Sequence, residues 1–280
     1  MIIPIILWST NSELKMKNIS PILITSPCQR SGTTLLVRLL NSSRNTMIYG
    51  ENAANDIAFL INQITHRRLF LAHNKNQRDL QLQTMLDGNL NQWIPDLLPK
   101  IDDYLNSMEK AFFNHIYFFE EYAKKKDRDV WGVKQPGWTG GNINVLWNSI
   151  PKSKVIYIYR NIESCLQSAK GIQLVNNSDD AKVFLQGYLN SYNSVMQLPD
   201  SDKMLKIEFS DLIENPEKSI SKIQTFTGIS DIDRSVMDTK INTYFGDNRS
   251  KETKDGYISP IELSKDEKNL ITEVEGKMIN

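Results

Sequence analysis

The sequence predicts an α/β fold, and three observations support this class. The 280 residues, 40% hydrophobic and 24% charged, are enough for one globular α/β domain. Residues 21–41 read as a strand, a polar turn and a helix in immediate succession. Residues 155–159 form a continuous apolar run, which is typical of a central strand buried on both faces.

The first predicted unit places a polar loop between a strand and a helix. Residues 21–26 have strand character, residues 27–32 form a turn that contains glycine, and residues 33–40 carry leucines at helical spacing. The first N–H groups of a helix have no intrahelical partner and point at whatever the loop encloses. The turn is therefore predicted to bind an anion, and an ordinary strand-to-helix connection is the alternative.

This turn departs from the Walker A pattern of phosphate-binding loops. Gly32 and the hydroxyl residue Thr34 keep its register, but Thr33 stands in place of the lysine and Pro27 in place of the first glycine. A cation reappears at Arg30, whose guanidinium group can hold two oxygens at once. The loop is P-loop-like, with an arginine supplying the charge.

Composition excludes several classes of function. The 33 basic residues balance the 33 acidic ones, so no global field attracts nucleic acid or an anionic membrane. The two cysteines, Cys28 and Cys165, are too few for a disulfide framework or a metal site, which favours a reducing, cytoplasmic location. The apolar start, residues 1–8, is far shorter than the ~20 residues of a membrane span. We expect a loose tail over residues 1–15 and a single domain over residues 16–280.

The stretch over residues 52–128 is predicted to be a helical insertion that borders the acceptor cleft. Apolar residues recur three and four apart near both of its ends. Its histidines, His66, His73 and His115, lack the spacing of metal ligands. We therefore expect no metal site in it.

Two later strands end on cations. Residues 130–133 precede Lys134, which is well placed to line a cleft, although a solvated surface lysine is the alternative. Residues 155–159 precede Arg160, where a P-loop kinase would usually place an aspartate for magnesium. An arginine there would repel the metal and attract another anion.

The remainder of the chain continues the alternation of strands and helices. Arg160 and Ser168, two turns along the helix predicted over residues 161–175, can converge on one phosphate. The other predicted elements are helices 181–198, 216–227 and 264–277, a strand 204–208 and a polar loop 246–256.

Taken together, these pieces resemble the sulfotransferases that use 3′-phosphoadenosine-5′-phosphosulfate (PAPS), and their spacing is closest to the tyrosylprotein sulfotransferase branch and its bacterial relatives. The matching pieces occur in the family's order. They are Arg30 to Leu36, Gly50-Glu51, Lys134-Gln135-Pro136, Pro151 to Arg160 with Ser168, and Asp211-Leu212 through Asn215-Pro216-Glu217. The helical stretch after Glu51 matches poorly.

The resemblance implies a three-layer, P-loop-like fold with a mostly parallel sheet, PAPS as the sulfuryl donor and no metal. It places the 3′-phosphate between Arg160 and Ser168, aligns Glu51 with the general base, and aligns Lys134 with the lysine that steadies the transferring group. Arg30 belongs to both the catalytic and the cofactor-binding set. The other implied phosphosulfate-binding residues are Ser31, Gly32, Thr33, Thr34 and Leu35.

Some assignments stay open at this point. Glu51 could be a plain acid at a helix start, and Phe209 stands where the tyrosylprotein branch has a cofactor-contacting tyrosine. A P-loop kinase of a small molecule and a non-catalytic nucleotide-binding module are the alternative functions. The acceptor is predicted to carry a hydroxyl, whether phenolic, saccharide or on a small metabolite, and the sequence does not indicate an oligomeric state.

Overall fold

A five-stranded parallel sheet forms the centre of the computed structural model, which describes residues 19–279 apart from residues 92, 94–95 and 242–256. The strand order is β2-β3-β1-β4-β5, and each pairing between neighbours is parallel. The strands are β1 (Ile22–Thr25), β2 (Thr46–Tyr49), β3 (Val130–Lys134), β4 (Lys154–Tyr159) and β5 (Met204–Glu208). The predicted α/β class with a mostly parallel sheet is confirmed.

Helices connect and cover these strands. They are α2 (Thr33–Ser42), α3 (Glu51–Ala72), α4 (Lys75–Leu86), α5 (Ile101–Lys124), α6 (Gly140–Ser149), α7 (Ile162–Gly171), α8 (Ser178–Met196), α9 (Phe209–Glu214), α10 (Pro216–Thr227), α11 (Lys265–Glu275) and the 3₁₀ helix η1 (Arg234–Asp238). Sequence patterns did not predict α6. Its start is fixed by a capping box, in which Thr139 and Asn142 satisfy each other's backbone N–H groups.

Two apolar clusters cover the two faces of the sheet, as the three-layer prediction requires. On one face, Leu23 and Tyr157 pack with residues of α3, α5 and α6. On the other, Ile24 and Ile156 pack with residues of α2, α9 and α10. Because side chains alternate along a strand, neighbouring residues of β1 and β4 serve opposite layers. This double burial explains the continuous apolar run that the sequence shows in β4.

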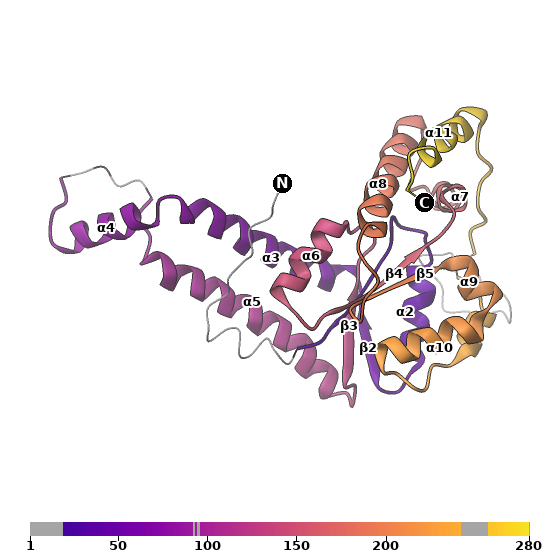
Figure 1. Ribbon diagram of the computed structural model, residues 1–280, viewed down its shortest axis with the longest axis horizontal. Helices are drawn as coiled ribbons and strands as arrows, with labels where there is room; N and C mark the ends of the chain where they lie inside the picture. The colour runs from indigo at the N-terminus through magenta and orange to yellow at the C-terminus, as the bar shows by residue number, and fades with distance from the viewer. Residues whose placement is uncertain (1–18, 92, 94–95, 242–256, 280) are drawn as a thin grey trace.

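The predicted helical insertion consists of α3, α4 and α5. Figure 1 shows α3 and α5 running together away from the sheet, with α4 at their far end. Near the sheet, Ile57 and Ile61 of α3 pack with Phe112 and Ile116 of α5 in the same buried cluster. No helix in the described part of the chain is long and apolar enough to cross a membrane.

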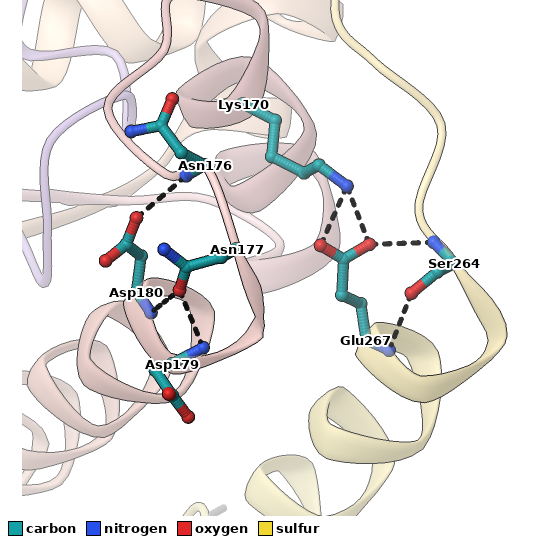
Figure 2. A network of polar contacts seen from close by, with 7 residues as sticks. All are labelled: Lys170, Asn176, Asn177, Asp179, Asp180, Ser264 and Glu267. Carbon is teal, nitrogen blue, oxygen red and sulfur yellow. Dashed lines mark hydrogen bonds and ion pairs between the residues drawn. The ribbon is translucent and has the colours of Figure 1, made fainter.

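The last helix, α11, is fastened to α7. Lys170 of α7 donates from Nζ to both carboxylate oxygens of Glu267 over 2.7 Å, as Figure 2 shows. Ser264 and Glu267 also form the capping box that begins α11, which confirms the predicted helix start. The C-terminal helix therefore braces the helix that carries Ser168. The predicted tail over residues 1–15 and the whole loop over residues 246–256 lie outside the described residues.

Candidate functional site

All five parallel strands deliver residues to one edge of the sheet. The loop over residues 26–32 follows β1, Glu51 follows β2, and Lys134 ends β3. Arg160 follows β4 and Phe209 follows β5. Carboxyl ends of parallel strands lie at the same edge, which is where open α/β sheets bind their ligands.

The first loop has a backbone conformation that depends on glycine. Gly32 has φ 101°, and an added Cβ would lie 2.3 Å from an atom of the Phe209 ring. Gly32 is also the N-cap of α2, and it provides no side-chain hydrogen bond to the helix. The first N–H groups of α2 are therefore left for a ligand or solvent. Arg30, with φ 74°, is a second left-handed residue in the same loop.

Polar contacts inside the loop hold its shape. Ser26 Oγ donates to the carbonyl oxygen of Cys28 over 2.7 Å, and Ser31 Oγ donates to the same oxygen over 3.0 Å. Both serines are fully buried. Their hydroxyls satisfy a carbonyl that the tight turn would otherwise bury without a partner.

One cation belongs to the loop, and two more lie at the ends of neighbouring strands. Arg30 Nε donates to Ser168 Oγ over 3.1 Å, which joins the loop to α7. The guanidinium carbon of Arg160 lies 4.7 Å from the centre of the Phe209 ring, so the Phe209 side chain touches both Arg160 and the loop at Gly32. Lys134 supplies the third cation from the end of β3.

The predicted pair of catalytic side chains is in direct contact. Lys134 Nζ donates to Glu51 Oε1, and both side chains line a pocket of about 620 Å³. Glu51 is the first residue of α3 and follows Gly50, its N-cap. The pocket is lined by Thr34, Val37, Arg38, Tyr49, Gly50, Glu51, Asn52, Ala53 and Lys134. The proposed base thus opens onto a space that also reaches the first turn of α2.

The predicted nucleotide-binding residues differ in their burial and in their access to the pocket. Ser31 and Thr33 are buried in the loop and first helical turn, whereas Thr34 lines the pocket. The side chain of Leu35 packs on the apolar cluster beneath α2, so only its backbone N–H could serve a ligand. Ser168 contacts Arg30, and no hydrogen bond between Ser168 and Arg160 is present among the described residues.

Five pocket residues, namely Val37, Arg38, Tyr49, Asn52 and Ala53, were not predicted from the sequence, and two of them make hydrogen bonds to other segments. Arg38 donates from Nη1 and Nη2 to the carbonyl oxygens of Thr239 and Val236 over 3.0 and 2.8 Å. It follows Thr34 by four positions, so helical spacing alone could have placed both on one face. Tyr49 donates to the carbonyl oxygen of Phe119 over 2.8 Å, and burial raises the pKa of its hydroxyl. Its hydroxyl is thus a structural contact with the insertion.

One comparison with known proteins identifies a family. The model of the sulfotransferase family matches residues 21–233, which is most of the chain. A comparison with curated protein sequences finds no match.

Similar solved structures include three sulfotransferases. The sulfotransferase domain of the Synechococcus PCC 7002 olefin synthase has 15% identity and a TM-score of 0.47, over 92% of this chain and 95% of that one. Sulfotransferase STF1 from Mycobacterium tuberculosis H37Rv has 15% identity and a TM-score of 0.44, over 79% and 70%. Mouse SULT7A1, solved with adenosine 3′,5′-bisphosphate (PAP), has 16% identity and a TM-score of 0.42, over 78% and 60%. On the family match, the chain belongs to the sulfotransferase family and is an enzyme of sulfuryl transfer.

Proposed function

We propose that this enzyme transfers the sulfuryl group of PAPS to an acceptor hydroxyl, leaving PAP and a sulfate ester. The contact between Lys134 and Glu51 carries this proposal, because it places a cation and a carboxylate at one pocket beside the nucleotide loop. A cation is needed where negative charge develops, and a carboxylate can accept the proton of the acceptor.

The loop and its neighbours suit a nucleotide with anions at two ends. Uncapped N–H groups of α2, together with Arg30, suit the 5′-phosphosulfate. Arg160 follows β4, and Ser168 lies on α7, where it accepts a hydrogen bond from Arg30; both residues suit a phosphate on the ribose. This arrangement favours PAPS over a nucleotide without the 3′-phosphate.

The proposed reaction forms one bond to sulfur and breaks another. The acceptor oxygen attacks sulfur while the bond from sulfur to the bridging oxygen of the phosphosulfate breaks. Glu51 takes the acceptor proton, and Lys134 and Arg30 stabilise the charge on the transferring group and the leaving phosphate oxygen. Fixed cations can do this without a divalent metal, so we expect activity in the presence of a chelator.

The acceptor is proposed to enter the pocket that Glu51 lines. Val37, Ala53 and the ring of Tyr49 give this pocket apolar walls, and Asn52 adds an amide group. A phenol, a saccharide or a small metabolite with a hydroxyl is compatible with such a lining. Cytoplasmic action is proposed from the two unpaired cysteines, Cys28 and Cys165.

A thermal-shift comparison of PAP, ADP and adenosine monophosphate tests the donor. A ligand that binds only the folded state raises stability by RT ln(1 + [L]/Kd). PAP should raise the melting temperature most, because only PAP carries a phosphate at the 3′ position as well as at the 5′ position. An equal shift with ADP would contradict the proposed 3′-phosphate site.

Transfer from radiolabelled PAPS to a panel of acceptors, with and without a chelator, tests the reaction. Incorporation that persists with the chelator is expected. Activity with ATP that vanishes on chelation would instead support a P-loop kinase. Tight PAP binding with no transfer to any acceptor would favour a non-catalytic nucleotide-binding module.

A further inference from the structure

The two cysteines of the chain lie close together at the loop that follows β1, although they are far apart in the sequence. Cys28 belongs to the loop after β1, and Cys165 lies on α7, one turn before Ser168. Both are free and buried. The hydroxyl oxygen of Ser31 lies 3.5 Å from the sulfur of Cys28 and 3.6 Å from the sulfur of Cys165. One hydroxyl therefore sits between two thiols on separate elements.

The surroundings make the two thiols chemically unequal. Burial raises the pKa of Cys28, and its hydrogen bond with Cys165 raises it further. The same hydrogen bond lowers the pKa of Cys165 despite burial, and the Ser31 hydroxyl and the charges of Arg160 and Arg30 act in the same direction. These opposite shifts favour Cys165 as the attacking sulfur and Cys28 as the resolving one.

We propose that Cys28 and Cys165 form a thiol–disulfide modification site, whose oxidation by a peroxide lowers the affinity of the loop for nucleotide. The sulfur of Cys165 attacks one oxygen of hydrogen peroxide, and the O–O bond breaks to leave a sulfenic acid and hydroxide, which takes up the proton that the Cys165 thiol gives up and becomes water. The sulfur of Cys28 then attacks the sulfenic sulfur. The S–S bond forms, and the hydroxyl leaves with the Cys28 proton as a second water. Two electrons pass from the sulfurs to the peroxide.

The predicted loss of affinity follows from what the bond would join. A disulfide brings the two sulfurs within about 2.05 Å, so the loop must shift toward α7. Ser31 contacts both thiols, and Arg30 of the same loop donates a hydrogen bond to Ser168 of α7. A shift of the loop would therefore disturb both contacts. The effect on nucleotide rests on the proposed function, whereas formation of the disulfide does not.

Peroxide treatment of the whole protein tests the proposal. The protein is treated with hydrogen peroxide, the excess is removed with catalase, and thiols are counted under denaturing conditions. We expect both thiols to disappear, the intact mass to fall by two hydrogen atoms, and a linked peptide to contain Cys28 and Cys165. The Kd for PAP, measured by calorimetry, should rise roughly tenfold or more, as for one lost hydrogen bond to a charged group. Dithiothreitol should restore it.

Single variants separate this effect from other oxidation. Cys28→Ala and Cys165→Ala should form no intramolecular disulfide and show no dithiothreitol-reversible change in PAP affinity. Methionine sulfoxide, the other peroxide product, is not reduced by dithiothreitol within the assay and so serves as an internal control. Two thiols that survive treatment, or a disulfide that leaves the Kd unchanged, would overturn the proposal. Failure of the reduced protein to bind PAP would count against the proposed function, while the thiol count would still judge the disulfide.

Discussion

Arg30 Nε donates a hydrogen bond to Ser168 Oγ over 3.1 Å, which ties the first loop to α7. The sequence resemblance assigns Arg30 to the 5′-phosphosulfate and Ser168 to the 3′-phosphate. Because these residues are in direct contact, the two proposed anion sites are adjacent. A substitution in one site should therefore also change ligand affinity at the other.

Ser168→Ala removes the acceptor of this hydrogen bond and one proposed phosphate ligand. We expect PAP binding to weaken by about tenfold, the usual effect of losing a hydrogen bond to a charged group. Calorimetric titration with PAP measures it. Ser164→Ala, one turn earlier on the same helix, is the matched control and should leave the Kd unchanged. Equal effects of the two substitutions would remove Ser168 as a ligand.

Arg160→Ala should weaken PAPS and PAP by about 10- to 100-fold, because it removes a cation from the proposed 3′-phosphate site. Adenosine 5′-phosphosulfate, which lacks that phosphate, should lose far less affinity. Competition binding with the three nucleotides measures the difference. Arg67→Ala, at an exposed position of α3, is the control for loss of one positive charge. Equal weakening of all three nucleotides by Arg160→Ala would contradict the assignment.

Glu51→Gln keeps the shape of the side chain but removes the proposed proton acceptor. Turnover should fall by about 10²–10⁴-fold, the usual contribution of a general base, with PAP affinity nearly unchanged. Initial rates with saturating PAPS and calorimetry with PAP separate the two effects. Glu217→Gln, on the exposed start of α10, controls for loss of a surface carboxylate. A turnover equal to that of the parent enzyme would exclude Glu51 as the base.

Gly32→Ala combines an unfavourable backbone conformation with a clash against Phe209. Gly228→Ala is its control, since Gly228 has φ 81° with nothing within 4 Å of an added Cβ. We expect Gly228→Ala to cost about 1 kcal/mol of unfolding free energy from the left-handed conformation alone. Gly32→Ala should cost about 1–3 kcal/mol more through overpacking.

Chemical denaturation of both variants measures these costs. Adding Phe209→Ala to Gly32→Ala should relieve the steric part. Similar losses for the two single variants would show that the ring yields without cost.

Glu267→Gln tests the brace between α11 and α7 through pH. Burial alone would raise the pKa of Glu267, but hydrogen bonds from Lys170 and Ser264 lower it below its usual value. A carboxyl group with a lowered folded-state pKa stabilises the protein above its unfolded pKa and loses that contribution as pH falls through the folded value. We expect the variant to be less stable at pH 7 by about 2 kcal/mol.

The difference between the variant and the parent should shrink below about pH 4, near the unfolded pKa of glutamate. Denaturation at pH 7 and at lower pH checks this. Glu273→Gln, an exposed partner of Lys277 on the same helix, should change little at either pH. If the difference in unfolding free energy between Glu267→Gln and the parent does not change with pH, the carboxylate charge of Glu267 is not what holds α11.

Local patterns in the sequence were sufficient for the elements that carry their own signals. The uniformly apolar run of β4 indicated a buried strand, and the capping box at Ser264 gave the start of α11. Strand β5 and helix α10 have the predicted bounds. These features depend on neighbours in the chain, so periodicity and capping chemistry reveal them. The capping pair before α6 carried the same kind of signal and was missed.

The sequence predicted which residues belong to the candidate site, but not which of them are in contact. The motifs placed Arg30, Glu51, Lys134 and Arg160 at strand ends, and a parallel sheet brings such ends to one edge. The sequence could not show that Glu51 contacts Lys134 or that Arg38 lines the same pocket. Those contacts depend on how the layers pack.

By itself, the sequence determined the α/β class, the strand-loop-helix unit in which we predict an anion site, and the membership of the chain in a family of sulfuryl-transfer enzymes. Only the tertiary structure decided that Ser168 pairs with Arg30, that Phe209 lies against both Gly32 and Arg160, and that Ser31 contacts both Cys28 and Cys165. The physical reason is the separation along the chain of the residues that interact. Helix and strand signals come from residues a few positions apart, whereas these contacts join segments that only the folded sheet brings within a few ångströms.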